Sequence, residues 1–205
     1  IWTHLSTQGT ATFDNINIKT VYVNDRSVNA NGLQVHGTIT KSAVATGADL
    51  VKYSGFYSDK YFEQPYNSDL DFGTGDFSIS FWMKNTNSAS NNQVVVDRLL
   101  SGTGLIIRVD YPTGLTRLQL LESGSADTLV GTVQTHAGPW TYMVAQRTGS
   151  TIQLFTDGVL NVSMTSTRNI SVNTSLLIGT NRAKDATYSA PYMSLALFRI
   201  SATAP

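Results

Sequence analysis

The sequence predicts an all-β protein built as an antiparallel two-sheet sandwich. Residues 77–84 alternate apolar and polar side chains, which is the pattern of a strand with one buried face. Other short alternating segments bounded by turn residues recur along the chain, a spacing typical of sandwiches and barrels. No window of the sequence has the apolar period of an amphipathic helix.

Residues 1–53 differ from the rest of the chain and are predicted to form a β-rich stalk, attachment or oligomerisation segment. Their apolar residues are few and are spaced among Asn, Gly and Thr. Isolated short strands with so little apolar surface do not offset the entropy lost when the chain is ordered. The segment must therefore dock onto the sandwich or associate with copies of itself, and we favour copies. Residues 42–55 would connect it to the sandwich, with room for one helical turn around residues 48–50.

The strand at residues 77–84 has the most clearly defined faces. A glycine-rich turn at residues 71–76 leads directly into it. Its apolar side is formed by Phe77, Ile79, Phe81 and Met83. Trp82 is the exception, because it falls among the serines on the polar side.

The remainder of the predicted sandwich domain, residues 54–205, continues as short strands joined by turns. The alternating strands expected next are residues 94–98, 105–109, 116–122 and 128–134. Glycine, proline and serine mark the turns between them. The Asp157-Gly158 pair is the strongest signal for a tight turn.

Length and charge limit the classes of function. At 205 residues the chain can bury one full core, as a sandwich with a small appendage. Its 14 basic and 14 acidic residues give a net charge of zero, and no run of Lys or Arg provides the positive surface that nucleic acid or anionic membranes require. No apolar run approaches the roughly 20 residues of a membrane-spanning helix. We therefore expect neither nucleic acid binding nor membrane insertion.

The absence of cysteine removes disulfides, thiolate nucleophiles and cysteine-based zinc sites together. A protein that folds in a reducing cytoplasm does not need disulfides. The sequence starts at Ile1 without a charged and then apolar leader, so we expect a fragment or a processed product without a signal peptide.

Several segments, in order, resemble the laminin-G-like domains of the concanavalin A-like lectin/glucanase superfamily. Residues 77–84 resemble the opening strand, and residues 140–159 resemble a hairpin in which a Trp-led strand precedes a strand ending in Asp-Gly. Residues 175–179 and 193–200 resemble the last core strands. The resemblance covers about residues 54–205 and implies a jelly roll of two antiparallel sheets. It is nearest to the versions found in bacteriophage tail and fibre proteins.

No catalytic constellation is found. Glycosidases on this fold place two or three carboxylates on one strand, so that acid and base face the same sugar bond. Glu63 and Glu122 are the only glutamates and are far apart in sequence. Asp97 and Asp110 fall on neighbouring predicted strands, but solvent-facing or salt-bridged strand residues are the stronger interpretation of both. We predict no catalytic residue and no enzymatic activity.

The resemblance also implies a calcium site, because many members of the superfamily hold Ca²⁺ with loop carboxylates and carbonyls. Asp69, Asp71 and Asp76 form the densest acidic cluster, beside Gly73 and Gly75. Hard oxygen ligands from one loop suit Ca²⁺. Aspartate is also the ordinary residue of turns, and that interpretation is the stronger one. No motif requires a cofactor.

The three histidines, His4, His36 and His136, lie singly and without the spacing of a zinc site. Each is predicted to be a surface or interface residue. His36 has one further interpretation: on a strand of a trimeric stalk, three copies of it would meet around the axis.

Aromatic residues are the usual platforms for sugars, because a ring packs against the apolar face of a pyranose. Tyr111 lies beside Pro112, and Tyr188 and Tyr192 flank Pro191, all in predicted loops, where binding residues are common. These three tyrosines are the predicted ligand contacts. Trp82 is a fourth candidate, although the resemblance implies that another segment covers it.

The function predicted from these features is that of a structural fibre or spike protein on the surface of a phage virion. Its lectin-like domain would recognise a polysaccharide of the bacterial surface or cap the fibre. The expected partners are other copies of the chain in a homotrimer and other virion proteins. The alternatives are a monomeric secreted bacterial carbohydrate-binding or adhesion module and, last, a glycoside hydrolase or lyase with an unrecognised acid pair.

Overall fold

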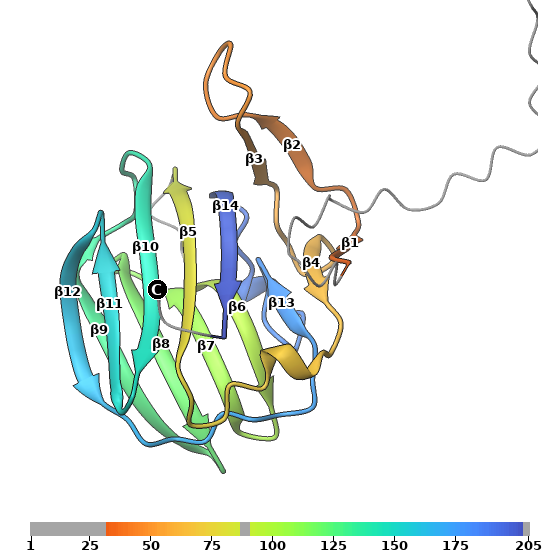
Figure 1. Ribbon diagram of the computed structural model, residues 1–205. Coiled ribbons are helices and arrows are strands. Elements are labelled where there is room, and N and C mark those ends of the chain that lie inside the picture. The colour runs from red at the N-terminus through yellow and green to blue at the C-terminus, as the bar shows by residue number, and fades with distance from the viewer. Residues whose placement is uncertain (1–31, 87–90, 203–205) are drawn as a thin grey trace, which may run out of the picture.

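The computed structural model describes residues 32–86 and 91–202 and shows two β-sheets packed face to face (Figure 1). Each sheet has seven strands, and every pair of neighbouring strands is antiparallel. The predicted all-β sandwich is therefore confirmed. The only helical segments in the described part of the chain are two short 3₁₀ turns, and neither has the length and apolarity to cross a membrane.

The first sheet has the strand order β1-β4-β13-β6-β7-β8-β9. In chain order its strands are β1 (Gln34–His36), β4 (Tyr61–Gln64), β6 (Gln93–Leu100), β7 (Thr103–Val109), β8 (Leu115–Glu122), β9 (Ser125–Gln134) and β13 (Leu176–Ile178). The second sheet has the order β12-β11-β10-β5-β14-β3-β2. Its strands are β2 (Thr40–Ala43), β3 (Val51–Ser54), β5 (Phe77–Asn85), β10 (Thr141–Thr148), β11 (Thr151–Thr156), β12 (Val159–Thr165) and β14 (Met193–Ser201). The 3₁₀ turns are η1 (Ser68–Leu70) and η2 (Ala186–Tyr188).

The core lies between the sheets and follows the alternation read from the sequence. All four apolar side chains predicted for the inner side of β5 are buried: Phe77, Ile79, Phe81 and Met83. Residues such as Leu105 and Ile107 on β7 and Leu118 on β8 face them from the other sheet and are fully buried. Burial of each large apolar side chain contributes about 1.5–3 kcal/mol, so this shared interior is the main source of stability.

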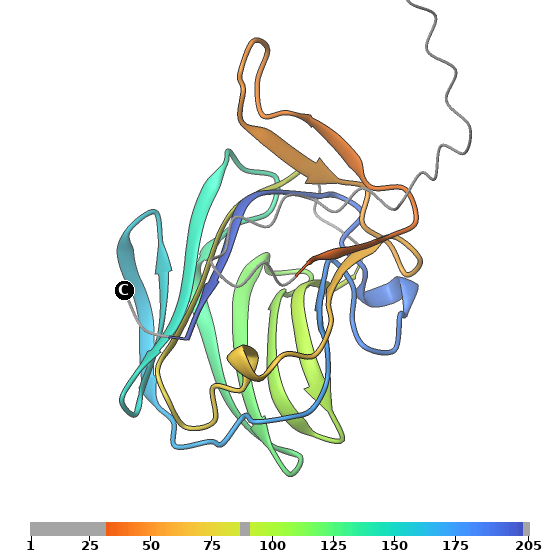
Figure 2. The ribbon, with the colours of Figure 1, turned by 45° about the vertical axis from the view of Figure 1, so that its right-hand side comes forward.

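The described N-terminal strands belong to the sandwich. β1 pairs with β4 at the edge of the first sheet, while β2 and β3 form a hairpin that joins the second sheet through β14. Figures 1 and 2 show this hairpin projecting from the body of the protein. Residues 34–54 are thus part of the sandwich on both sides of the predicted boundary at residue 53, because their few apolar side chains pack against the common core. Residues 48–50 lie in the loop between β2 and β3 and form no helix.

Other predictions for the N-terminal segment lie outside the described residues. The predictions for residues 1–31, including the one for His4, are among these. The homotrimer therefore stays a prediction.

The two ends of the sandwich differ. At one end, the lower one in Figure 1, residues 166–175 cross from the second sheet to the first. Arg98 and Arg147, both fully buried, hold this segment and the loop before β5. We call this the arginine end. The loops at 91–92, 110–114, 135–140 and 179–192 lie at the opposite end, which we call the loop end.

At the arginine end, Arg98 donates to Asp71 Oδ1 at 2.6 Å and to the carbonyl of Val172 at 2.6 Å. Arg147 donates to the carbonyls of Gly73 at 3.0 Å and Arg168 at 2.8 Å. The chain crossing is thus fixed by hydrogen bonds to charged groups, which are stronger than neutral ones.

Candidate functional site

The loop end positions its side chains through short turns between strands. The loop from β7 to β8 is closed by two backbone hydrogen bonds, from Gly114 N–H to Asp110 at 2.7 Å and from Asp110 N–H to Leu115 at 2.9 Å. Gly114 has a φ of +67°, and the ring of His136 occupies the space where a β-carbon would lie. Only glycine fits here, because the backbone conformation and the packed ring both exclude a side chain.

Two further segments meet this loop. Asn92 Oδ1 accepts a hydrogen bond from Tyr111 N–H at 2.8 Å and so ties the entry to β6 to the β7–β8 loop. The turn η2 begins at Asp185, whose side chain accepts from Thr187 N–H at 2.9 Å in a typical N-cap. This cap sets the direction of the chain at Thr187 and Tyr188.

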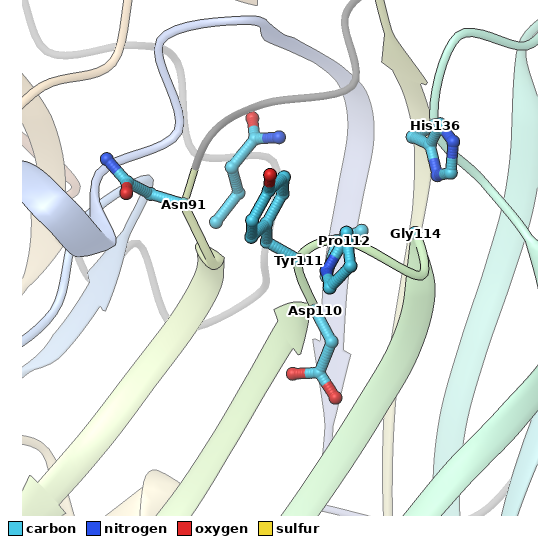
Figure 3. Close-up of a pocket in the computed structure, with 8 residues that line it drawn as sticks. Asn91, Asp110, Tyr111, Pro112, Gly114 and His136 are labelled. Atoms are coloured by element: carbon cyan, nitrogen blue, oxygen red, sulfur yellow. The ribbon is translucent and has the colours of Figure 1, made fainter.

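A groove of about 200 Å³ lies between these segments and is lined by Asn91, Asn92, Tyr111, Thr187 and Tyr188. A smaller hollow of about 10 Å³ adjoins it, between Asn91, Tyr111, Gly114 and His136. That hollow has room for about one water molecule. Figure 3 shows Asn91 and Tyr111 on one side of the hollow and His136 on the other.

Two of the four aromatic residues predicted to contact a ligand line the groove. Tyr111 is 51% exposed, and Tyr188 reaches the same groove from a distant part of the chain. Tyr192 is 44% exposed at the same end, but it does not line the groove. Trp82 lies on the outer side of β5, where it is 36% exposed and tilts against Tyr142 with ring centroids 5.4 Å apart. Trp82 is therefore only partly covered.

The sequence analysis did not identify the polar residues of the groove. Asn91, Asn92 and Thr187 supply two amides and one hydroxyl beside the tyrosine rings. The Asn-Asn pair directly before a strand was the one available signal, since adjacent amides at a strand entry suit a loop. His136 is half-buried against Gly114 and acts as packing for the loop.

The arrangement is chemically suited to holding an uncharged ligand that has both an apolar face and hydrogen-bonding groups. Rings supply flat apolar surface, while amides and hydroxyls supply both donors and acceptors. Among the side chains that line the two hollows, Asp110 supplies the carboxylate. Figure 3 shows this carboxylate pointing away from the ring of Tyr111. It already accepts hydrogen bonds from Arg108 at 2.8 Å and Arg117 at 2.6 Å.

The pair Asp97 and Asp110 has no free carboxylate. Asp97 is buried and accepts from the N–H groups of Leu99 at 2.9 Å and Arg182 at 2.8 Å. Burial raises the pKa of Asp97, and the two N–H donors oppose that rise. The expectation of a solvent-facing or salt-bridged residue is correct for Asp110 and wrong for Asp97, which is buried where the segment after β13 donates to it through the N–H of Arg182.

The three aspartates of the predicted calcium loop lie at the arginine end and are not brought together. Asp71 bonds Arg98 and accepts from Tyr66 at 2.9 Å. Asp76 accepts from the N–H of Gly149 at 2.7 Å. Over residues 32–86 and 91–202, no group of three His, Asp or Glu side chains is placed to hold a metal ion. These aspartates therefore form no cluster of three carboxylates, and calcium binding by this loop stays a prediction.

His36 lies on the outer side of β1 and stacks on Tyr61 with ring centroids 4.4 Å apart. Its Nε2 is 2.9 Å from Glu63 Oε2. Its predicted role at a trimer axis stays a prediction.

The sequence of the sandwich matches a known protein family. The family model Laminin_G_3, described as the concanavalin A-like lectin/glucanases superfamily, matches residues 58–205. No curated protein matches the sequence.

Solved structures share the fold. The binding domain of Paraclostridial Mosquitocidal Protein 1 is 15% identical, with a TM-score of 0.72 over 89% of this chain and 46% of that one. The binding domain of botulinum neurotoxin serotype D is 13% identical, with a TM-score of 0.68 over 89% and 47%. The binding domain of botulinum neurotoxin DC in complex with SialylT is 13% identical, with a TM-score of 0.66 over 87% and 45%. The chain spans less than half the length of these structures.

Proposed function

We propose that this chain, which belongs to the Laminin_G_3 family of the concanavalin A-like lectin/glucanase superfamily, binds a saccharide in the groove of the loop end and carries out no catalysis. The observation that supports this most is the convergence of Tyr111 and Tyr188 with three amide or hydroxyl side chains on one groove. A pyranose needs both, because it presents an apolar face and a rim of hydroxyls.

Binding is favoured over catalysis by the state of the carboxylates. Acid and base groups of a glycosidase must reach the sugar bond. Here Asp110 is held by two arginines and Asp97 by two backbone N–H groups. The structural neighbours are also described as binding domains. One of them was solved with SialylT, but this chain corresponds to less than half of that protein, so a saccharide ligand here is our proposal.

The setting that we propose is the surface of a phage virion, in a trimeric fibre or spike that contacts other virion proteins and a bacterial polysaccharide. It is supported by the lack of cysteine and by the resemblance of the sandwich to domains of phage fibres. Residues 1–31 would then take part in attachment or trimerisation.

A second setting, a secreted bacterial carbohydrate-binding module, is favoured by one observation. Strands β1, β2 and β3 complete the two sheets of their own chain, as expected if the N-terminal region docks in cis. The solution mass of the full chain by light scattering separates the two settings. A trimer supports the fibre, and a monomer supports the secreted module.

The binding proposal is tested on an array of bacterial surface polysaccharides. Tyr111→Ala and Tyr188→Ala should each weaken binding about tenfold, which corresponds to about 1.4 kcal/mol of lost contact. Leu100→Ala removes an exposed apolar side chain at the opposite end and is the control. Equal binding by all three variants, or cleavage of the polysaccharide by the wild type, would contradict the proposal.

A further inference from the structure

Two arginines face each other on the outer side of the first sheet, next to the loop end. Arg108 on β7 and Arg117 on β8 are direct partners in the antiparallel register. Their neighbours Ile107, Val109 and Leu118 point into the core, so the two guanidinium groups point away from it. Like charges directly opposite each other destabilise a strand pair, and the pairing therefore needs a compensating group.

Asp110 is that group, and it compensates only half of the charge. Its Oδ1 accepts from Arg108 Nε at 2.8 Å, and its Oδ2 accepts from Arg117 Nε at 2.6 Å. Two positive charges and one negative charge leave one net positive charge on these three side chains. The whole chain is neutral, so this excess is a local feature.

The guanidinium groups keep unused donors. Each carries five N–H bonds in a planar fork. Arg108 uses Nε, and Arg117 uses Nε and one Nη, toward Asp110. In the described part of the chain, no other hydrogen bond or ion pair engages these two side chains. They are 21% and 28% exposed, so the free N–H groups are accessible while Asp110 holds both forks in place.

We infer that Arg108, Asp110 and Arg117 form a subsite for the carboxylate of an acidic saccharide, such as a uronic or sialic acid unit. This inference rests on the proposed saccharide groove and extends it. The planar fork of an arginine matches the geometry of a carboxylate and can bind it through two parallel N–H···O bonds. Arg108 is three residues from Tyr111, and at about 3.3 Å per strand residue this is about 10 Å from the groove. A saccharide of a few units reaches from the tyrosines to the arginines.

The test compares acidic polysaccharides with their own carboxyl-reduced forms, in which the same backbone carries an uncharged hydroxymethyl group. Polygalacturonate, alginate, hyaluronan and polysialic acid are titrated in both forms against the full-length wild type. At least one acidic form should bind about tenfold or more tightly than its reduced form, the effect of a hydrogen bond to a charged group. The preference should decrease at high ionic strength.

Variants assign the preference to the arginines. Arg108→Gln and Arg117→Gln should each abolish most of the preference for the acid and leave binding of the reduced form unchanged. Arg199→Gln removes an exposed arginine from β14 and should keep the preference. The thermal midpoint of each variant is measured alongside, because a purely structural role would lower stability and weaken both forms equally.

The outcomes separate this inference from the proposed function. Equal binding of every acid and its reduced form overturns the carboxylate subsite, while the groove proposal stands if Tyr111→Ala still weakens binding. Binding of dextran sulfate as tight as that of the best carboxylate, lost equally in Arg199→Gln, would show general attraction of anions and also overturn the inference. Absence of binding to all of these acids overturns it as well, and the array decides on the groove separately.

Discussion

The two ends of the sandwich use arginine in opposite ways. At the arginine end, Arg98 and Arg147 are fully buried, and they donate to one carboxylate and to backbone carbonyls of the chain itself. At the loop end, Arg108 and Arg117 share one carboxylate and keep accessible donors. A buried guanidinium whose partners belong to the protein stabilises the fold. A partly exposed one with free N–H groups is available to a ligand.

This difference predicts where substitutions affect stability. Asp71→Leu should have the largest effect, because it leaves the fully buried Arg98 without its carboxylate. Removing one partner of a buried ion pair typically costs about 3–5 kcal/mol. Urea unfolding measures the loss, and binding by the folded fraction should not change. The exposed Asp49→Asn is the control. A loss no larger than that of the control would mean that Arg98 does not need Asp71.

A matched pair of arginine substitutions compares the ends directly. Arg147→Gln should lower the free energy of unfolding by about 2–3 kcal/mol, because hydrogen bonds from a charged, buried donor to two partly buried carbonyls are lost. Arg117→Gln should lower it by about 1 kcal/mol or less, since Asp110 retains Arg108 and the pair is partly exposed. Chemical unfolding of both variants is the measurement. Equal losses would remove the distinction between the ends.

A matched pair of glycine substitutions tests the packing of the loop end. Gly114→Ala and Gly124→Ala introduce a side chain at similar positive φ values of +67° and +82°. Gly124 has open space around its β-carbon position, whereas Gly114 is covered by the ring of His136. Both variants should lose about 1 kcal/mol from backbone strain. Gly114→Ala should lose more and should also weaken saccharide binding, as measured by titration. Identical behaviour would show that His136 moves aside freely.

The smallest expected effect is on the way that the free energy of unfolding depends on pH. Burial acts to raise the pKa of Asp71, but hydrogen bonds from Arg98, Tyr66 and the Val172 N–H outweigh it and hold the pKa below its ordinary value of 3.8. A lowered pKa in the folded state means that Asp71 contributes stability above pH 3.8, which is lost as the pH falls through the folded-state pKa. The raised pKa of Asp97 has the opposite sign, so its contribution is present below pH 3.8 and is lost as the pH rises through the folded-state pKa.

Unfolding of Asp71→Asn and Asp97→Asn between about pH 2 and pH 7 measures these two contributions. Asp71→Asn should lose stability less steeply than the wild type in acid. Asp97→Asn should lose it more steeply. The same slope in all three proteins would mean that neither carboxylate links stability to pH.

The strands were predictable because their signal is local. Apart from Trp82, apolar and polar side chains alternate over residues 77–84, so the inner face of β5 could be named residue by residue. Asp157-Gly158 forms the turn between β11 and β12 with positive φ at both residues. The short strands β1, β2 and β3 were not recognised as part of the sandwich. β3 joins the sheet through the distant β14, and three or four residues with few apolar side chains carry no periodic signal.

The groove was half predictable. Tyr111 and Tyr188 stood out because aromatic side chains beside prolines in loops suit ligand contact. Nothing in the sequence indicated that they would share a groove that excludes Tyr192, since the loop and the turn that carry them are far apart in the chain and meet only in the folded protein. The sequence also did not indicate which arginines are buried and which are accessible, because the residue type alone does not show how deeply a side chain lies in the fold.

The sequence by itself thus determined the fold class and the inner faces of the longer strands, since the alternation of neighbouring side chains follows from the geometry of a single strand. Tertiary structure alone decided the rest. In the folded protein, hydrogen bonds from Arg98 and Arg147 fix the segment that crosses between the sheets. The three aspartates of the predicted calcium loop form no cluster. Asn91, Tyr111 and Tyr188 come together in one groove. Each of these depends on the distances between residues far apart in the chain, and those distances are set only when the two sheets pack around one core.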